Sequence, residues 1–348
     1  MNARRKSIPI RLGNLTVGGD SPVTVQSMAK TDTRDARATI RQINELEEAG
    51  CEIIRVAVPD MEAASALPAI KKAIRIPLVA DIHFDHRLAL AACAAGVDGL
   101  RLNPGNISQP DKVEAVVRAA AERAVPIRIG VNAGSLPPAE SLAAGVAPRM
   151  VAAALAQVSL LESLDFNLIK VSLKAFDVPT TIEAYRDIAG RIPYPLHIGI
   201  TEAGTPRTGI IRSAVGIGVL LNMGIGDTIR VSLTAPPREE VAAGYEILKS
   251  LGLRQRGPVL VSCPQCGRSE VDIIELATRV ERELQRFTKP IRVAVMGCVV
   301  NGPGEAADAD IGVACGKGKA VLFKRGERIG TVTEEDILAS LMREIEQM

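Results

Sequence analysis

The feature that most constrains the fold of this sequence is a regular alternation of short β-branched runs with helix-like segments. Eight such runs, each apolar enough for a buried strand, occur in the first two thirds of the chain. They are VTVQSM (23–28), IIRVAV (53–58), PLVADIHF (77–84), GLRLNPG (99–105), IRIGVN (127–132), NLIKVSL (167–173), PLHIGIT (195–201) and TIRVSL (228–233). The segments between them have a helical period. One places Ile40, Ile43 and Leu46 on a single stripe and stops at Gly50.

Eight strand–helix units predict an α/β fold of the (β/α)8 TIM-barrel type, since parallel strands need crossover helices to connect them. A doubly wound open sheet is the competing architecture. It usually has fewer units and a glycine-rich first turn, which this sequence lacks. The segment IRLGNLTVGGD precedes the first strand and is predicted to form a small hairpin that closes the barrel floor.

The chain changes character after the short polar linker LRQRGP. The runs PVLVSC and IRVAVMG predict strands on either side of a long helix, SEVDIIELATRVERELQRF. DIGVAC, KAVLFKRG and ERIGTV predict three more strands, and TEEDILASLMREIEQM predicts a capped terminal helix. We therefore expect two domains: a barrel of residues 1–254 and a small α/β domain of residues 255–348, in which most of the cysteines lie.

Bulk composition excludes several classes of partner. The net charge is only +2 and aromatic residues make up 2%, so neither a nucleic acid nor a membrane surface is expected as a partner. No run of about 18 apolar residues could span a membrane, and the basic N-terminus lacks the apolar region of a secretory signal. We expect a cytoplasmic protein whose cysteines are reduced thiols or metal ligands, with Cys51 and Cys93 as small core residues.

Charged residues interrupt the predicted barrel strands. Six cations lie within or at the end of otherwise apolar strands: Arg55, Arg101, Arg128, Lys170, Lys174 and Arg230. Because strand side chains alternate between faces, these should point inward near the C-terminal mouth, where barrel enzymes place their chemistry. Only Asp81 and Glu202 are expected nearby as acids, so a ligand should supply the missing negative charge, and a phosphate or diphosphate suits these cations. The alternative is that some cations lie outside the barrel and pair with helix acids.

Further polar groups stand at the predicted strand ends. They are Asp81, His83, Asn103, Asn132, His197, Thr201 and Glu202. We expect His197 to be a hydrogen-bonded structural residue. Glu202, in the segment ITEAG just beyond a strand, is a candidate proton donor among the cations.

The second domain carries a candidate metal centre. Cys263 and Cys266 have a CxxC spacing, which zinc, iron–sulfur and redox sites all use, and Cys298 adds a third thiol at a strand end. Asn-Gly and Pro-Gly steps between Cys298 and Glu305 predict a tight turn. With Cys315 as fourth ligand, the site favours structural zinc. With Glu305, a harder oxygen donor would leave one iron of a cluster open to substrate. Spacing alone leaves both possibilities open.

Several motifs together resemble one known family. They are CPQCGR, GCVVNGPGE, RLNPGN, KVSLK, HIGITEAG and IRVSLT. The chain resembles the bacterial 4-hydroxy-3-methylbut-2-en-1-yl diphosphate synthases of the methylerythritol phosphate pathway, in their short two-domain form, over essentially its whole length. This resemblance implies a TIM barrel followed by a small domain that carries a [4Fe–4S] cluster. It implies Cys263, Cys266, Cys298 and Glu305 as the cluster ligands and leaves Cys315 as a bystander.

The resemblance also implies the reaction. 2-C-methyl-D-erythritol 2,4-cyclodiphosphate would be opened reductively and lose water to give (E)-4-hydroxy-3-methylbut-2-enyl diphosphate, an intermediate of isoprenoid biosynthesis. Two electrons would arrive singly from reduced flavodoxin or ferredoxin. The residues implied to hold the substrate are Arg55, Arg101, Arg128, Asn132, Lys174, Arg230 and Ser232, with Thr201 and Glu202 at its hydroxyl end. His83, Lys170 and Asn301 are further substrate-binding candidates, and Glu202 and Glu305 are the candidate catalytic residues.

Two further expectations concern assembly and the main alternative. The resemblance implies a homodimer in which the cluster domain of one chain caps the barrel of the other, and the short LRQRGP linker is compatible with that arrangement. The alternative function is a non-redox, phosphate-handling TIM-barrel enzyme, such as an aldolase or a pterin synthase-like transferase, with a zinc-stabilised appendage.

Overall fold

The chain forms two compact units, Met1–Arg254 and Gln255–Met348. A computed structural model describes residues 2–83, 85–102, 109–136, 145–298, 300 and 302–348. Each unit has its own apolar core, and each is described below by itself.

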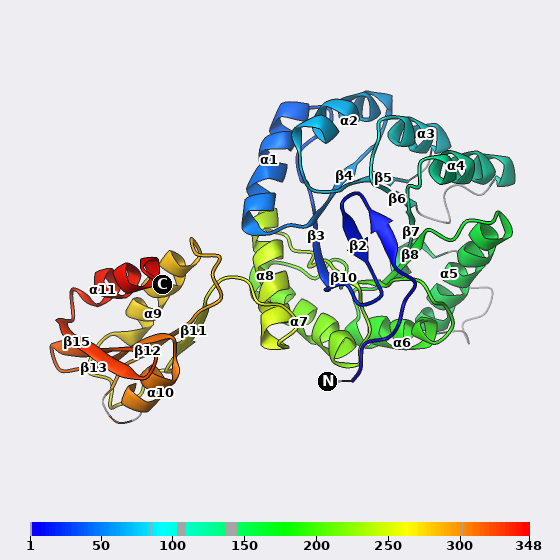
Figure 1. Ribbon diagram of the computed structural model, residues 1–348. Coiled ribbons are helices and arrows are strands. Elements are labelled where there is room, and N and C mark those ends of the chain that lie inside the picture. Colours follow the sequence, from blue (N-terminus) through cyan, green and yellow to red (C-terminus); the bar gives the residue numbers. More distant parts are fainter. Residues whose placement is uncertain (1, 84, 103–108, 137–144, 299, 301) are drawn as a thin grey trace. The chain divides into compact units, whose positions relative to one another are not determined.

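The first unit is a barrel of eight parallel strands, which confirms the predicted fold class (Figure 1). The strands are β3 (Thr24–Met28), β4 (Ile53–Ala57), β5 (Leu78–Ile82), β6 (Gly99–Leu102), β7 (Ile127–Asn132), β8 (Ile169–Lys174), β9 (His197–Ile198) and β10 (Thr228–Ile229). They follow the order β8-β7-β6-β5-β4-β3-β10-β9, and a parallel bridge between Val171 and Leu196 joins β8 to β9. The sheet therefore closes on itself.

In the part of the barrel that the structure describes, eight helices surround the strands as an outer ring (Figure 1). They are α1 (Ala36–Ala49), α2 (Met61–Ala73), α3 (His86–Ala94), α4 (Pro110–Glu122), α5 (Val146–Ser163), α6 (Val178–Ala189), α7 (Pro206–Asn222) and α8 (Pro237–Ser250), with a 3-10 turn, η1 (Ala133–Ser135), after β7. Helix α1 begins where the Asp35 carboxylate accepts from the Ala38 amide, and it ends at Gly50, whose φ of 106° is left-handed. The predicted stop at Gly50 is confirmed.

An N-terminal hairpin covers the barrel floor, as predicted. Strands β1 (Ile10–Leu12) and β2 (Leu15–Val17) pair antiparallel. Their apolar side chains pack against Ile53 and Val79, which lie at the N-terminal ends of β4 and β5. Cys51 and Cys93 are buried in the main core, which also confirms their expected role.

The last two barrel strands are shorter than the sequence pattern suggests. The runs at 195–201 and 228–233 predict long strands, but the ladder between β9 and β10 contains only two residue pairs. Directly beyond it, Gly199 lies against the Arg230 backbone so closely that a Cβ there would overlap the Arg230 carbonyl oxygen. The backbone diverges from regular pairing at this point, beside the barrel mouth.

The second unit is built on a sheet of order β11-β12-β13-β14-β15. Its strands are β11 (Val259–Ser262), β12 (Arg292–Met296), β13 (Ile311–Gly316), β14 (Lys319–Lys324) and β15 (Glu327–Thr333), and its helices are α9 (Ile273–Leu284), α10 (Gly302–Asp308) and α11 (Ile337–Glu346). Strands β11, β12 and β13 pair parallel, whereas β14 pairs antiparallel with both β13 and β15. Helices α9 and α11 share one apolar cluster with the sheet, whereas α10 packs through Ala306 against Ala294 and Ala314 on the other face.

Two local predictions for this unit are wrong. From Gly302 on, the segment predicted as a tight turn begins helix α10 instead, because proline is favoured in the first helical turn, where its missing N–H costs no hydrogen bond. Asn301, the first residue of the predicted turn, lies outside the described residues. The terminal helix α11 lacks the expected side-chain cap. Thr333 Oγ1 donates to the Asp336 carboxylate at 2.7 Å, so this carboxylate does not bond to a helix amide.

We predict that Gly199→Ala lowers the free energy of unfolding of the barrel by about 2–3 kcal/mol, because the added methyl would overlap the Arg230 backbone. Gly218→Ala is the matched control: a Cβ on this α7 glycine meets nothing within 4 Å, and alanine there should stabilise by about 0.5–1 kcal/mol. Urea unfolding followed by circular dichroism measures both. A Gly199→Ala protein as stable as wild type would contradict this packing.

Candidate functional site

A row of four charged side chains crosses the interior of the barrel. Asp81, Arg101, Arg128 and Lys170 are direct register partners on the neighbouring strands β5, β6, β7 and β8. Each is at most 4% exposed. One carboxylate and three cations are therefore held side by side by the strand ladder itself, within a barrel whose interior is usually filled by branched apolar residues.

Asp81 is the one acid of this row. Its carboxylate accepts from Arg101 Nη1 at 3.0 Å, and it lies 3.5 Å from Arg55 Nε and 3.4 Å from His83 Nε2. Burial alone would raise the pKa of Asp81, but Arg55, His83 and Arg101 outweigh it and hold the pKa of this carboxyl well below its usual range. Asp81 is therefore charged, and its charge is already engaged by protein cations.

Arg128 has hydrogen-bonding capacity that the protein does not use. Its Nη1 donates to Ser172 Oγ at 2.8 Å, whereas Nε and Nη2 have no partner among the residues that the structure describes. Burial and the neighbouring Arg55 and Arg101 lower its pKa well below the ordinary value. Lys174 ends β8 on the same inward face as Lys170. Burial, and then Arg128, also lower the pKa of Lys174 well below its ordinary value. An anion bound here would relieve both effects.

Glu240 is a second interior acid, which sequence reasoning missed together with its partner Lys30. Glu240, in the first turn of α8, is buried and lies 3.2 Å from Lys30 Nζ and 3.4 Å from Arg230 Nη2. It also accepts from the Leu233 amide at 3.0 Å and from Ser27 Oγ at 3.2 Å. One more cation and one more acid leave the predicted excess of positive charge unchanged.

The remaining predicted barrel residues lie around this group. His83 has a half-exposed side chain whose Nε2 is 2.9 Å from Arg101 Nη1, and Asn132 ends β7 on the inward face shared with Arg128. Ser232 accepts from Arg230 Nη1 at 2.5 Å. Thr201 is half-buried and Glu202 is exposed, and both follow β9. Glu202 has a left-handed backbone with a φ of 53°, a conformation that a non-glycine residue adopts at an energetic cost and that is common at functional sites.

His197 differs from its prediction. It is only 1% exposed, and neither ring nitrogen has a hydrogen-bond partner within the described part of the chain. The expected structural hydrogen bond is therefore absent from that part. Burial, and then Lys174 and Arg128, lower its pKa well below the ordinary value, so the ring is neutral. Burial is the larger cause, and the surrounding cations act in the same direction.

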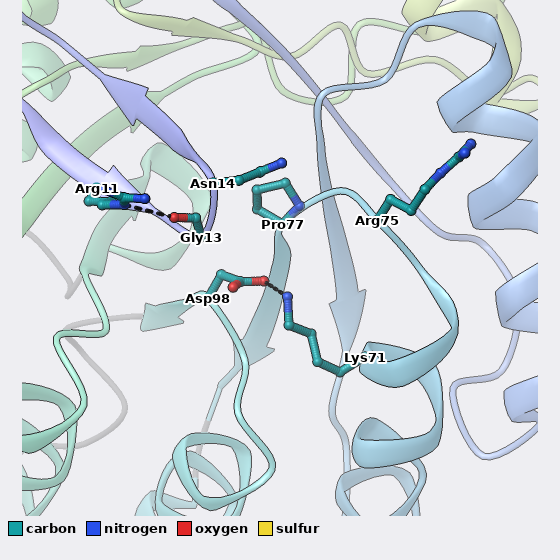
Figure 2. Close-up of a pocket in the computed structure, with 7 residues that line it drawn as sticks. All are labelled: Arg11, Gly13, Asn14, Lys71, Arg75, Pro77 and Asp98. Carbon is teal, nitrogen blue, oxygen red and sulfur yellow. Dashed lines mark hydrogen bonds and ion pairs between the residues drawn. The ribbon is translucent and has the colours of Figure 1, made fainter.

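A separate hollow lies at the opposite end of the barrel, beside the β1–β2 hairpin (Figure 2). Its polar groups are mostly engaged with each other: Lys71 pairs with Asp98 at 2.5 Å, and Asp98 also accepts from the Leu78 amide at 2.7 Å. Arg75 pairs with Glu47 at 2.9 Å. Lys71 and Arg75 have acids beside them and reach solvent, unlike the cations at the mouth, so the hollow is the weaker candidate for an anion site.

The three thiols of the second unit lie at one edge of its sheet. Strands β11 and β12 are parallel neighbours with Ser262 opposite Val295, so Cys263 and Cys298 both follow strands that end on the same side. Cys263 Sγ accepts from the Gly297 amide at 3.3 Å. Cys263 and Cys298 are half-buried and Cys266 is exposed, so all three thiols are at least partly open to solvent.

The two candidates for the fourth ligand lie on different faces of the sheet. Cys315 is fully buried in the core that α9 and α11 cover, and burial raises the pKa of its thiol to about 12. Glu305 is exposed in the first turn of α10, which packs on the other face. An accessible carboxylate fits a metal centre open to solvent better than a core thiol. Asn301, the other candidate near here, lies outside the described residues.

The described residues do not contain a complete metal site. Among them, no three His, Cys, Asp or Glu side chains are grouped closely enough to hold a metal ion. The chemistry of the donor set still suits an iron–sulfur cluster, because three accessible thiols follow neighbouring strand ends and a carboxylate stands on the next helix.

No helix in the described ranges is both long and apolar enough to cross a membrane.

Comparison with known proteins gives a consistent match over the whole chain. Residues 7–245 match the model of the GcpE TIM-barrel domain, and residues 259–347 match that of the GcpE protein C-terminal domain. The chain is 67% identical to the 4-hydroxy-3-methylbut-2-en-1-yl diphosphate synthase (flavodoxin) of Dehalococcoides mccartyi strain CBDB1, with 99% of both chains covered. It is 57% identical to the protein of the same name from Geobacter sulfurreducens, with 99% of this chain and 98% of that protein covered.

Solved structures show a likeness of fold only. The dihydropteroate synthase of Xanthomonas albilineans matches with a TM-score of 0.52 and 14% identity, over 71% of this chain and 98% of that one. The type I 3-dehydroquinate dehydratase of Clostridium difficile matches with a TM-score of 0.51 and 16% identity, over 70% and 98%. Both likenesses support the barrel architecture.

We predict that Glu240→Gln lowers the free energy of unfolding of the barrel by about 2–4 kcal/mol in phosphate-free buffer, because Lys30 and Arg230 lose their carboxylate partner. Added pyrophosphate should stabilise this variant more than wild type, since the excess of positive charge is larger. The exposed neighbour Glu239→Gln serves as the control and should behave as wild type. Thermal melts with and without pyrophosphate decide, and equal shifts in all three proteins would contradict the charge balance described.

Proposed function

The chain belongs to the GcpE family of 4-hydroxy-3-methylbut-2-en-1-yl diphosphate synthases, and from this premise we propose that it is an oxidoreductase of isoprenoid biosynthesis. It opens 2-C-methyl-D-erythritol 2,4-cyclodiphosphate reductively and removes water, giving (E)-4-hydroxy-3-methylbut-2-enyl diphosphate. The single structural observation that carries this proposal is the excess of buried cations inside the barrel, which a cyclic diphosphate would neutralise.

The diphosphate is held by the inward-facing cations. Arg128 offers Nε and Nη2, which make no hydrogen bond to any described residue, and Lys174 and Arg230 reach the same space. Arg55 and Arg101 add positive charge but are tied to Asp81, so their guanidinium groups are held in fixed positions before the substrate arrives. Such preorganisation lets the phosphate oxygens bind without reordering the side chains. Asn132, Ser232 and His83 complete the proposed binding set.

Proton delivery is assigned to the segment after β9. The hydroxyl that leaves the substrate must take up a proton to depart as water, and a positioned carboxylic acid can supply it. Glu202 is exposed on a left-handed turn that follows β9, with the half-buried Thr201 next to it to bind the substrate hydroxyl. A proton bound to Glu202 would pass to this oxygen, and the resulting carboxylate would take up a new proton from solvent.

Cys263, Cys266, Cys298 and Glu305 are the residues that would hold a [4Fe–4S] cluster. When bound, such a cluster supplies electrons one at a time, received from reduced flavodoxin or ferredoxin; flavodoxin stands in the printed names of the relatives. The chain's own contribution is to keep three thiols at one sheet edge and Glu305 accessible on α10. Cys315 takes no part, because it packs in the apolar core.

The working unit is a homodimer in which the cluster domain of one chain faces the barrel of its partner. The short LRQRGP linker supports this arrangement, since it limits how the second unit can reach the barrel of its own chain. Exposed apolar side chains on the outer surface of α7, Ile211, Val215 and Val219, recur at every fourth residue and are suited to burial against a second copy.

We predict that anaerobically purified protein is brown, with about four iron and four sulfide per chain, as expected for one cluster. Cys298→Ala should lose this iron. Cys315→Ala, the matched control, should keep it, because Cys315 lies in the core. Colourless protein with one zinc would support the non-redox alternative instead. Glu305→Ala should retain part of the iron but lose turnover, and full activity in that variant would remove Glu305 from the site.

We further predict that Arg128→Ala weakens binding of the cyclodiphosphate about tenfold to a hundredfold, the loss expected for charge-assisted hydrogen bonds. Its iron content should stay unchanged, since Arg128 belongs to the barrel unit. Arg118→Ala, on the exposed surface of α4, removes the same charge without touching the interior and should bind as wild type does. Titration calorimetry gives the affinities, and an unchanged Kd for Arg128→Ala would show that the substrate binds elsewhere.

A further inference from the structure

Lys170 lies below the cations that are proposed to hold the diphosphate. It is the second residue of β8 and points into the barrel on the same face as Lys174, which lies two side-chain repeats nearer the mouth. It lines a small internal cavity with Leu12 of the floor hairpin, Gln26 of β3 and Arg128. Lys170 is therefore inside the barrel but on the floor side of Lys174.

No acid in the described part of the chain pairs with Lys170. The side chain is 3% exposed, and its Nζ has no hydrogen-bond partner among the described residues. Its register partner is Arg128, itself a cation. Asp227, just before β10, attracts the Lys170 ammonium electrostatically. Its carboxylate is already engaged, however, by Arg4 at 2.7 Å and by the Leu196 amide at 2.7 Å.

The other ionisable groups of the interior do not supply the missing charge. They are Lys174 on β8, His197 on β9, Arg230 on β10, Arg55 on β4, Asp81 on β5, Arg101 on β6 and Glu240 on α8. The two acids among them are engaged by Arg55, Arg101, Lys30 and Arg230. An unpaired ammonium in such a place is costly, and a lysine avoids the cost by giving up its proton.

We propose that Lys170 is a proton-linked positioning residue: at pH 8 it is uncharged in the empty barrel and takes up one proton from solvent when a diphosphate binds above it. This rests on the proposed function, because it requires a diphosphate at the mouth. The step is the conversion of the Lys170 amine to an ammonium, with no other bond made or broken. Burial, and then Arg128, lower the pKa of Lys170 to about 7, which puts its titration where a nearby anion can reverse it.

Calorimetry of pyrophosphate binding counts the protons. Full-length, anaerobically purified protein is titrated at pH 8 in two buffers of different ionisation enthalpy. The change in measured heat between the buffers gives the protons taken up per pyrophosphate. Lys170→Met removes the amine at similar volume, and the exposed Lys72→Met removes a surface lysine as a control. The ionisation of pyrophosphate itself is common to all three proteins and cancels from the comparison.

Lys170→Met should take up close to one proton fewer than wild type and Lys72→Met the same number as wild type. By linkage, a difference of one proton makes the wild-type Kd rise about tenfold more per pH unit above pH 7 than that of Lys170→Met. Lys174 affects all three proteins alike, because burial, Arg128, Arg230, Arg55 and Arg101 lower its pKa and all of these are unchanged in the variants.

A second variant guards against misfolding of the first. Lys170→Arg carries a permanent charge, so it should also take up one proton fewer, yet bind pyrophosphate at pH 8 at least as tightly as wild type. A merely structural role would not separate proton count from affinity in this way. Equal proton uptake in wild type and a folded Lys170 variant would overturn the inference alone. Absence of pyrophosphate binding to wild type would overturn the proposed function, and this inference with it.

Discussion

Positive charge buried in excess of its counter-charges is the constraint on which the rest of this structure depends. The strand ladder sets Arg101, Arg128 and Lys170 side by side, and within that row Asp81 is the one negative counter-charge. Glu240 is the second acid, supplied by a helix and not by the barrel strands. What the protein leaves unneutralised defines its ligand: a compact anion with several oxygens and more than one negative charge.

The fold tolerates this interior because its apolar core lies elsewhere. Most of the apolar packing is formed between the outer faces of the strands and the helices around them, with the floor closed separately by the β1–β2 hairpin. Glycine makes room where long cationic side chains cross: at Gly130 a Cβ would come within 2.7 Å of Arg101 Nε. Because the ligand binds the folded barrel and offsets its internal repulsion, substrate binding should also stabilise the fold.

Sequence patterns carried the prediction furthest where the geometry is periodic. The two-residue period of strands was sufficient to place Arg128, Lys170 and Lys174 on the inward face, and the strand–helix alternation was sufficient for the barrel. Glu240 and Lys30 were missed because they come from a helix and a loop, where no strand period applies. His197 was misread because its surroundings, and not its own position in the sequence, decide whether it has a partner.

The second unit shows the same limit. Spacing identified Cys263, Cys266 and Cys298 but could not choose between Cys315 and Glu305, since spacing does not say which face of a sheet a residue occupies. In β13, Cys315 lies on the same face as Ile311 and Val313, which points into the core. The Pro303 segment was read as a turn, although the same residues suit the first turn of a helix, and that helix carries Glu305 on the opposite face.

The central claim is that the cationic barrel and the accessible thiols belong to one reductive enzyme acting on a cyclic diphosphate. A single-turnover experiment tests it most directly. Iron- and sulfide-loaded protein is mixed anaerobically with reduced flavodoxin and 2-C-methyl-D-erythritol 2,4-cyclodiphosphate, and the products are identified by mass spectrometry. We expect linear hydroxymethylbutenyl diphosphate, with two electrons withdrawn from reduced flavodoxin for each product molecule formed. Quantitative recovery of unchanged cyclodiphosphate from the loaded, reduced protein would contradict it.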